Sequence, residues 1–329
     1  MKERLQIRDI VAECGQEVEG FVAIGETACG PLQFPLVIIN GQEDGPVMCF
    51  TGGVHATEYA PIDAVMRLVQ ELQPEKLRGA IIAVPVMRMR MFENRTGFVS
   101  PLDGLNLNKI APGRKDGSIT EILAHVMLGE IIGAAEYHID FHAGDLGEIL
   151  LAFAGYSLTG NREQDEKGKA LVRAFTPELM SLSTREKTSI PPFAATLNYE
   201  AARNGVVSIL AESGGNGTLE EADVQVHLDG AHNVLRHLGM IDGSPVIGPR
   251  TNALDRVIVR ATRGGLVRLK VQLGDEIKTG QEVAEICNVF GEVVERVKTP
   301  GAGIVGLIWA HKVVNTGDPI VRYWITEAA

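Results

Sequence analysis

Cysteine is scarce in this chain, and no long apolar run is present. The four cysteines are spread over 329 residues without a CxxC pair, at positions Cys14, Cys29, Cys49 and Cys287. Their spacing predicts neither a disulfide framework nor a thiolate zinc knuckle, and it favours a reducing compartment. The longest apolar candidate, residues 301–310, is interrupted by glycine and is shorter than the roughly 18 residues that a membrane span needs.

Positive charge is also in deficit, with 31 Lys and Arg against 42 Asp and Glu and a formal net charge of -11. This balance would repel a phosphate backbone, so nucleic acid is not an expected partner, although a local cationic pocket could still bind a small anion. Residues 1–10 alternate charged and apolar side chains, unlike a secretory signal. We expect a soluble cytoplasmic protein without a membrane partner, able to form a homo-oligomer.

Between residues 35 and 242, short apolar runs alternate with glycine-containing turns and amphipathic stretches. This pattern predicts an α/β fold with a mixed sheet flanked by helices. The expected strands are residues 35–39, 47–52, 80–86, 137–142, 149–154 and 206–212. The expected helices are 61–72, one that follows a capping box from Ser118 to Glu121, and 219–238, which ends before Gly239.

A change of character follows the Gly- and Pro-rich residues 242–250, which read as a linker. Residues 257–323 show alternation broken by many turns, which predicts a smaller all-β domain. Two of its sequence segments resemble those of biotinyl and lipoyl carrier domains, which have the barrel-sandwich fold. The stretch CNVFGEV at 287–293, however, lacks the lysine that such carriers present. We therefore divide the chain into a catalytic domain at 1–245 and a small β domain at 250–329.

The strongest local motif is TGGVHATEYAP at 51–61, where His55 and Glu58 follow an apolar strand and a Gly-Gly turn. On a helical turn, a spacing of three places both side chains on one face. Strand ends that open into loops are where α/β folds build their sites. By itself, however, an HxxE motif is more often two polar residues of a surface loop.

A second motif, YHIDFHAGD at 137–145, places His142 at the exit of an alternating strand. Catalytic zinc takes three His or carboxylate ligands and leaves one position open, so His55, Glu58 and His142 would complete the set. His138 is an alternative ligand that lies deeper in the strand. Asp140 is better interpreted as an acceptor that orients a ligand histidine.

The strand VVSILAE at 206–212 ends in Glu212, before a glycine-rich turn. As a structural residue, Glu212 would cap that turn. As a catalytic residue, it would take a proton from a metal-activated water and pass it to a leaving amine.

The segment SPLDGLNLNKIAPG at 100–113 is too rich in Asn, Gly and Pro for a regular element and predicts a connector or a binding loop. Asn108 and Lys109 could bind a substrate carboxylate. Arg88, Arg90 and Arg95 lie just upstream and add positive charge, which a solvated charge run would explain equally well.

In this order, the four segments resemble the succinylglutamate desuccinylase/aspartoacylase family, whose catalytic domain is similar to that of the zinc carboxypeptidases. The resemblance covers most of residues 35–240, and the family's C-terminal β domain matches from about residue 250. It implies that His55, Glu58 and His142 bind one zinc ion per subunit. It further implies that Glu212 is the general acid and base and that Asn108 binds the substrate carboxylate.

The chain departs from the family pattern after Asn108, where Lys109 stands in place of the usual arginine. Lysine keeps the charge but lacks the planar fork that grips a carboxylate with two hydrogen bonds. The family also uses an arginine upstream of this loop to polarise the scissile carbonyl, and Arg95 is the nearest candidate.

The implied function is a zinc-dependent hydrolase that removes an acyl group from a small N-acylated amino acid or related amide. A zinc carboxypeptidase that acts on peptides is the alternative, since it would share the metal site and the glutamate. The family resemblance implies that the β domain narrows the entrance and excludes long chains. A third class, a non-catalytic binding protein, is disfavoured because all three ligand types and Glu212 are present.

Overall fold

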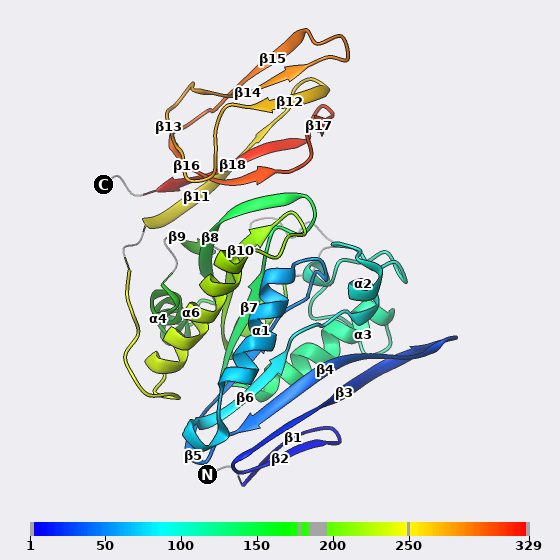
Figure 1. Ribbon diagram of the computed structural model, residues 1–329, viewed down its shortest axis with the longest axis vertical. Coiled ribbons are helices and arrows are strands. Elements are labelled where there is room, and N and C mark those ends of the chain that lie inside the picture. The colour runs from blue at the N-terminus through cyan, green and yellow to red at the C-terminus, as the bar shows by residue number, and fades with distance from the viewer. Residues whose placement is uncertain (1–2, 177–178, 184–195, 249–250, 327–329) are drawn as a thin grey trace.

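One large mixed sheet runs through the molecule and carries helices on both faces (Figure 1). The computed structural model describes residues 3–176, 179–183, 196–248 and 251–326. Within these residues, the sheet has 12 strands in the order β13-β16-β18-β11-β9-β8-β10-β7-β5-β6-β4-β3. The mixed α/β architecture expected from the sequence is thereby confirmed.

The strands are β1 (Arg4–Ile7), β2 (Ile10–Glu13), β3 (Gln16–Thr27), β4 (Gly30–Asn40), β5 (Glu43–Thr51), β6 (Arg78–Val84), β7 (Tyr137–His142), β8 (Glu148–Ser157), β9 (Leu179–Ser183), β10 (Val207–Gly215), β11 (Thr251–Arg260), β12 (Gly265–Leu269), β13 (Glu276–Ile277), β14 (Glu282–Cys287), β15 (Val293–Lys298), β16 (Gly303–Trp309), β17 (Val313–Val314) and β18 (Pro319–Thr326). The helices are α1 (Tyr59–Glu71), α2 (Met89–Asn94), α3 (Ile119–Val126), α4 (Arg162–Phe175), α5 (Leu197–Arg203) and α6 (Glu221–His237), with shorter turns η1 (Pro74–Lys76), η2 (Leu107–Lys109), η3 (Met127–Ile131) and η4 (Ile132–Ala134).

Each predicted strand and helix of the α/β region is present, with bounds that differ by a few residues. The predicted helix at 219–238 is α6, and Gly239 follows it with a φ of +69°, the left-handed conformation that closes a helix. Glu121 accepts a hydrogen bond of 2.9 Å from the Ser118 backbone N–H at the start of α3, as one half of a capping box does. Strands β1 to β3 lie before the region for which strands were predicted.

Two apolar cores cover the two faces of the sheet. One core joins α1, α4 and α6 to the sheet and includes Ile139 and Phe141 of β7. The other joins α3, α5 and the β1-β2 hairpin to the opposite face. Alternate residues of β7 therefore face apolar surroundings, while His138, Asp140 and His142 point the other way. The predicted alternation of this strand is confirmed.

The C-terminal part consists of strands and turns, and its described residues, 251–326, contain no helix. Strand β11 pairs with β9 and strand β16 pairs with β8, so the large sheet continues into this part. Because β18 lies between β16 and β11, the strands β8, β9, β11, β18 and β16 form a closed ring of pairings. The C-terminal strands are thus fixed directly to β8, which starts at the edge of the site described below.

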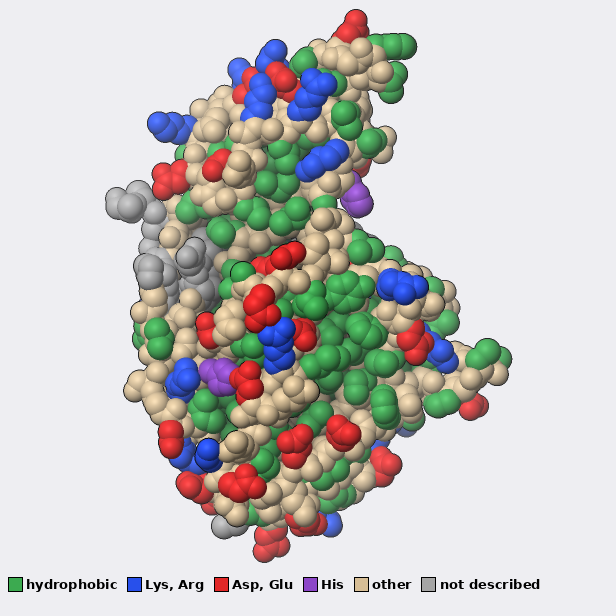
Figure 2. All heavy atoms as spheres, in the orientation of Figure 1, with side chains coloured by type: hydrophobic (Ala, Val, Ile, Leu, Met, Phe, Trp, Pro, Cys, Tyr) green, Lys and Arg blue, Asp and Glu red, His purple; other side chains and the backbone are tan. Residues whose placement is uncertain are grey.

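Charged side chains of both signs are interspersed on the face seen in Figure 2, without a continuous basic stripe. Among the described residues, no helix is both long and apolar enough for a membrane crossing.

The contact between α6 and α4 supports β7 on the face of the sheet opposite to His138, Asp140 and His142. A Cβ added to Gly230 of α6 would overlap the buried ring of Phe175, which lies 6.2 Å from the Phe141 ring between centroids. Glycine in a helix interior normally costs about 1 kcal/mol relative to alanine, so its presence here reflects this close approach.

We predict that Gly230→Ala lowers the free energy of unfolding by about 1–3 kcal/mol, because the added methyl displaces a packed aromatic ring. Urea denaturation measures the change. The matched control is Gly129→Ala in η3, where nothing lies within 4 Å of an added Cβ and where stability should be kept or slightly increased. Equal effects at the two glycines would contradict the packing argument.

Candidate metal centre

The candidate residues meet where three neighbouring parallel strands end. Strand β7 lies between β5 and β10, and Thr51 pairs with Asp140 while Glu212 pairs with His142. The carboxyl ends of parallel strands open together at one edge of a sheet, where α/β proteins bind ligands. Segments that lie far apart in sequence are therefore brought to one edge.

The segment that carries His55 and Glu58 makes a tight exit from β5. Gly53 has a φ of +67°, and an added Cβ would lie 3.0 Å from the Val86 Cα, so a side chain would be strained here. Glu58 donates its backbone N–H to the His55 oxygen at 3.3 Å, and α1 begins at the next residue. The two residues thus share a turn that precedes the helix, and the Glu58 carboxylate makes no capping bond.

His55, Glu58 and His142 form one buried cluster. One ligand-type atom of each lies within 4.8 Å of the others, and their side chains are at most 7% exposed. His55 Nδ1 lies 2.8 Å from Glu58 Oε1, and His142 Nδ1 lies 3.2 Å from Glu58 Oε2. Both imidazoles therefore turn Nδ1 toward the same carboxylate.

The outer nitrogens of both imidazoles have polar neighbours. His55 Nε2 and Asn106 Oδ1 are 3.1 Å apart in a hydrogen bond, whereas His142 Nε2 and Asp140 Oδ2 make an ion-pair contact of 3.1 Å without hydrogen-bond geometry. A proton on Nε2 leaves the Nδ1 lone pair of a histidine free to bind a metal, as orienting partners commonly arrange. Asp140 thus lies where an orienting acceptor was expected. The contact of Asn106 with His55 was not predicted from the sequence.

His138 lies on the same side of β7 but is engaged elsewhere. Its Nε2 lies 2.8 Å from Thr51 Oγ1, and its Nδ1 lies 2.8 Å from Ser208 Oγ. Burial lowers the pKa of His138 to about 4, which keeps the ring neutral. Because both ring nitrogens have hydroxyl partners, His138 is not available as a ligand in this arrangement.

The charges of the cluster depend on one another. Burial alone would raise the pKa of Glu58, but His55 and His142 outweigh it and hold that pKa below its ordinary value. Burial would likewise lower the pKa of His142, yet Asp140 and Glu58 raise it well above its ordinary value. Without a metal, the protein keeps this carboxylate charged by holding a proton on His142.

The cluster fits a divalent metal. Glu58 Oε2 is buried and has no hydrogen-bond partner among the described residues, although it faces an imidazole. Buried carboxylate oxygens are rarely left unpaired. Two imidazole nitrogens and one carboxylate oxygen are also the ligand set of a catalytic zinc site with an open position.

Glu212 lies beside this cluster in β10, at the last position where β10 pairs with β7. Burial raises the pKa of its carboxyl to about 8, with a further upward contribution from Glu58 and Glu148 and an opposing one from His142 and Arg322. No described residue hydrogen-bonds its side chain, so the capping role considered from the sequence has no contact to support it.

Glu148 and Arg322 were not identified from the sequence. Glu148 starts β8 just after the DFHAGD motif, and Arg322 lies in β18 of the C-terminal part. Burial raises the pKa of Glu148, against the charge of Arg322. Position next to a motif could have pointed to Glu148, whereas no local signal marks Arg322.

Asp145 joins the loops around the cluster. It accepts hydrogen bonds from Thr57 Oγ1, from the Phe98 N–H at 2.6 Å and from the Leu146 N–H at 2.7 Å. The Phe98 ring packs edge-on against His55 at 5.0 Å between centroids. Asp145 therefore positions the HxxE turn and an aromatic wall together.

The loop at 98–109 carries the remaining predicted residues. Asn108 has a buried Oδ1 without a hydrogen-bond partner among the described residues, while its backbone N–H donates to Asn106 Oδ1 at 2.9 Å. Lys109 and Arg95 are exposed, and Arg95 lies at the C-terminal end of α2. No hydrogen bond or ion pair joins Lys109 or Arg95 to the cluster within the described residues, and their roles stay predictions.

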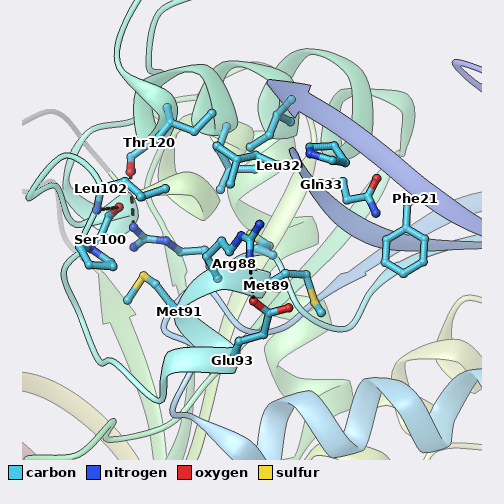
Figure 3. A pocket seen from close by; sticks show the side chains of 17 residues that line it. Phe21, Leu32, Gln33, Arg88, Met89, Met91, Glu93, Ser100, Leu102 and Thr120 are labelled. Carbon is cyan, nitrogen blue, oxygen red and sulfur yellow. Dashed lines mark hydrogen bonds and ion pairs between the residues drawn. The ribbon is translucent and has the colours of Figure 1, made fainter. Parts of the chain in front are cut away.

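Behind this loop lies a cavity of about 320 Å³ (Figure 3). Its lining includes Met89, Leu102 and the buried Arg88. Arg88 donates hydrogen bonds of 3.4 Å to the backbone oxygens of Phe98 and Leu105. None of the residues of the metal cluster lines this cavity. Arg88 binds the backbone of the loop and is not exposed to solvent.

Comparisons with known proteins agree with this geometry. Residues 44–238, more than half of the chain, match the succinylglutamate desuccinylase/aspartoacylase catalytic domain. The chain belongs to this family. The family resemblance noted in the sequence is thereby confirmed, and family membership makes the chain a deacylase.

Individual relatives of this family match most of the chain. The N-alpha-acetyl-L-2,4-diaminobutyric acid deacetylase of Halomonas elongata is 28% identical over 305 residues, which are 90% of this chain and 86% of that protein. The product-bound ectoine utilization protein EutE (DoeB) of Ruegeria pomeroyi has a TM-score of 0.87 at 22% identity, covering 99% of this chain and 100% of the other. A succinylglutamate desuccinylase of Silicibacter sp. TM1040 has a TM-score of 0.86 at 22% identity, with coverages of 98% and 100%. The two structures establish likeness of fold.

We predict that metal binding releases a proton. Asp140 and Glu58 raise the pKa of His142 well above its ordinary value, which favours its protonated form, and it must lose that proton to ligate. Zinc affinity should therefore increase with pH and level off above the raised pKa. Titration calorimetry of the apoprotein in buffers of different ionisation enthalpy measures the release. A zinc affinity that stays constant between about pH 6 and pH 8 would contradict this assignment.

We predict that Asp145→Asn lowers the free energy of unfolding by about 1–3 kcal/mol, because an amide N–H then faces the Phe98 or Thr57 donor. Thermal and urea denaturation provide the measurement. Asp116→Asn, at an exposed position in the same half of the chain, is the control and should have little effect. If the Asp145 variant were as stable as the wild type, the hydrogen bonds that Asp145 accepts would contribute little to the stability of the fold.

Proposed function

We propose that the protein is a zinc-dependent hydrolase that removes the acyl group from a small N-acylated amino acid. The main support is the buried meeting of His55, Glu58 and His142 beside a carboxylate, Glu212, that no described residue binds. The ligands would be these three side chains, with one zinc ion per subunit. The curated relative from Halomonas elongata, named for removing an acetyl group from an amino acid, supports the substrate class.

The chemistry is divided between the metal and the chain. A bound zinc ion would supply Lewis acidity and lower the pKa of a water in the open position. Glu212 accepts a proton from the attacking water and donates it to the departing amine, a role that suits a carboxyl with a raised pKa. Asn106, Asp140 and Asp145 hold the surrounding groups in place. The products are a carboxylate and a free amine.

Substrate binding is assigned to the loop at 98–109. Asn108 binds the substrate carboxylate with its amide, which is partly buried and has no side-chain partner among the described residues. Lys109 adds positive charge near the entrance. Arg95 is retained as the candidate for polarising the scissile carbonyl, which requires movement of the segment after α2.

We also propose that residues 1–245 and 250–329 act as separate domains and that the second is a barrel-sandwich. Two sheets of the C-terminal part, β15-β14-β12-β17 and β13-β16-β18-β11, enclose one apolar core that includes Val283, Ile286 and Val321. Sheets that pack face to face over a shared core support this interpretation.

We predict that Glu212→Gln lowers kcat by about 100-fold to 10,000-fold, because the amide can neither accept nor deliver the proton. The zinc content of the purified protein should not change, since Glu212 is not a ligand. Hydrolysis of N-acetyl, N-formyl and N-succinyl amino acids, with metal analysis alongside, provides the measurement. Glu166→Gln on the exposed face of α4 is the matched control.

Two results would contradict the proposal. Unchanged turnover in the Glu212 variant would remove this residue from the mechanism. A preference of the zinc-loaded protein for N-terminally blocked peptides with a free C-terminal carboxylate over N-acetyl amino acids would instead indicate a carboxypeptidase.

A further inference from the structure

Two charged side chains from opposite halves of the molecule share one surface of the ring of strands. Glu148 of β8 pairs with Trp309 of β16, and Leu307 of β16 pairs with Arg322 of β18. Paired residues, and residues two apart on one strand, lie on the same face of a sheet. Glu148, Trp309 and Arg322 are therefore on one face, next to the edge where β8 meets the metal cluster.

Arg322 is held in place without a polar partner. Its guanidinium carbon lies 5.5 Å from the centroid of the Trp309 ring, within the range of a cation–π contact. Its Nε is buried and has no hydrogen-bond partner, and no ion pair joins its guanidinium to a residue in the described part of the chain. A half-buried guanidinium whose Nε has no hydrogen-bond partner is free to bind a carboxylate that a ligand supplies.

Glu148 is equally fixed and equally unpaired. Its backbone N–H donates to the Gly144 oxygen and its oxygen accepts from the Asn216 N–H, each at 2.8 Å. No hydrogen bond or ion pair to its carboxylate occurs within the described ranges, although the side chain is about half buried. Burial raises its pKa, and the charges of Arg322, Glu58 and His55 also act on it.

A direct pair between the two residues would have satisfied both, and the structure does not contain one. Strand β8, which carries Glu148, pairs directly with β10, which carries Glu212. Strand β18, which carries Arg322, reaches β8 through β16. The order of strands therefore places Glu148 nearer to the catalytic cluster and Arg322 farther out.

We propose that Glu148 and Arg322 form a two-charge selectivity pocket for a mono-N-acylated diamino acid, in which Arg322 binds the carboxylate and Glu148 binds the free ammonium group. The inference rests on the proposed deacylase function. It adds a substrate specificity that deacylation by itself does not require. Arg322 supplies the planar fork that Lys109 lacks, while Asn108 contributes neutral donors to the same carboxylate. The C-terminal part would then select the substrate directly as well as narrow the entrance.

The pocket is tested first on the wild-type protein with three matched ligands. These are 2,4-diaminobutyrate, 2-aminobutyrate, which lacks the second amine, and 2,4-diaminobutyramide, which lacks the carboxylate. Calorimetric binding to zinc-loaded protein is compared with hydrolysis of their N-acetyl derivatives. Loss of either charge from the ligand should weaken binding by about 10-fold to 100-fold.

The variants Glu148→Gln and Arg322→Gln assign each charge to a residue. Glu148→Gln should weaken binding of 2,4-diaminobutyrate by about 10-fold to 100-fold and leave 2-aminobutyrate nearly unchanged. Arg322→Gln should weaken both carboxylates and leave the carboxamide nearly unchanged, and Arg322→Lys should recover part of the loss. Exposed Glu276→Gln and Arg268→Gln of the C-terminal part are the matched controls, and thermal melts of all variants identify any that fail to fold.

The outcomes separate this proposal from the proposed function. Equal losses on all three ligands in both variants would overturn the pocket and assign the pair a structural role, even if the wild type is an active deacylase. Equal binding of the three ligands to the wild type would overturn it as well. Selective binding without hydrolysis of any N-acyl compound would support the pocket and contradict the deacylase instead.

Discussion

The site depends on one buried carboxylate held between two imidazoles. Glu58 faces Nδ1 of both His55 and His142 where little water can reach it. An ionised carboxylate in such surroundings costs several kcal/mol unless a counter-charge is present. A proton on His142 supplies that charge in the free protein, and a divalent cation can replace it. The proposed metal binding would therefore exchange one positive charge for another among side chains that are already in place.

The rigidity of this cage comes from the sheet. His142 ends β7 and pairs with Glu212, the last residue of β10 that pairs with β7, so their separation is set by backbone pairing. Asp145 then fixes the HxxE turn to the loop that carries Phe98. Groups held by strands and by buried acceptors need little reorganisation during a reaction, which is what catalysis by positioned charges requires. The C-terminal strands extend the same construction, because they hydrogen-bond to β8.

The sequence allowed the α/β region and the four central residues to be predicted, for physical reasons that are local. The alternation in β7 shows which of its side chains face the apolar core and which face the other way. A polar residue that follows a run of apolar strand residues is easily recognised in the sequence. Glu148 and Arg322 carry no such signal. Arg322 lies in an ordinary alternating strand, and its proximity to Glu148 depends on the β16–β8 pairing, which joins residues far apart in the chain. The extension of the large sheet into the C-terminal part is unpredictable for the same reason.

The arginines near the loop at 98–109 show why charge in a sequence does not identify a substrate anchor. Arg88 is buried and bonds the carbonyls of Phe98 and Leu105, and Arg90 forms an ion pair with Glu93 at 3.3 Å. Their charges are committed to holding the loop and its helix, and Arg95 is directed to solvent. Arg88 and Arg90 are therefore not free to bind a substrate carboxylate. Arg322, half-buried against Trp309 and without an ion pair in the described part of the chain, is the cation that we assign to that carboxylate.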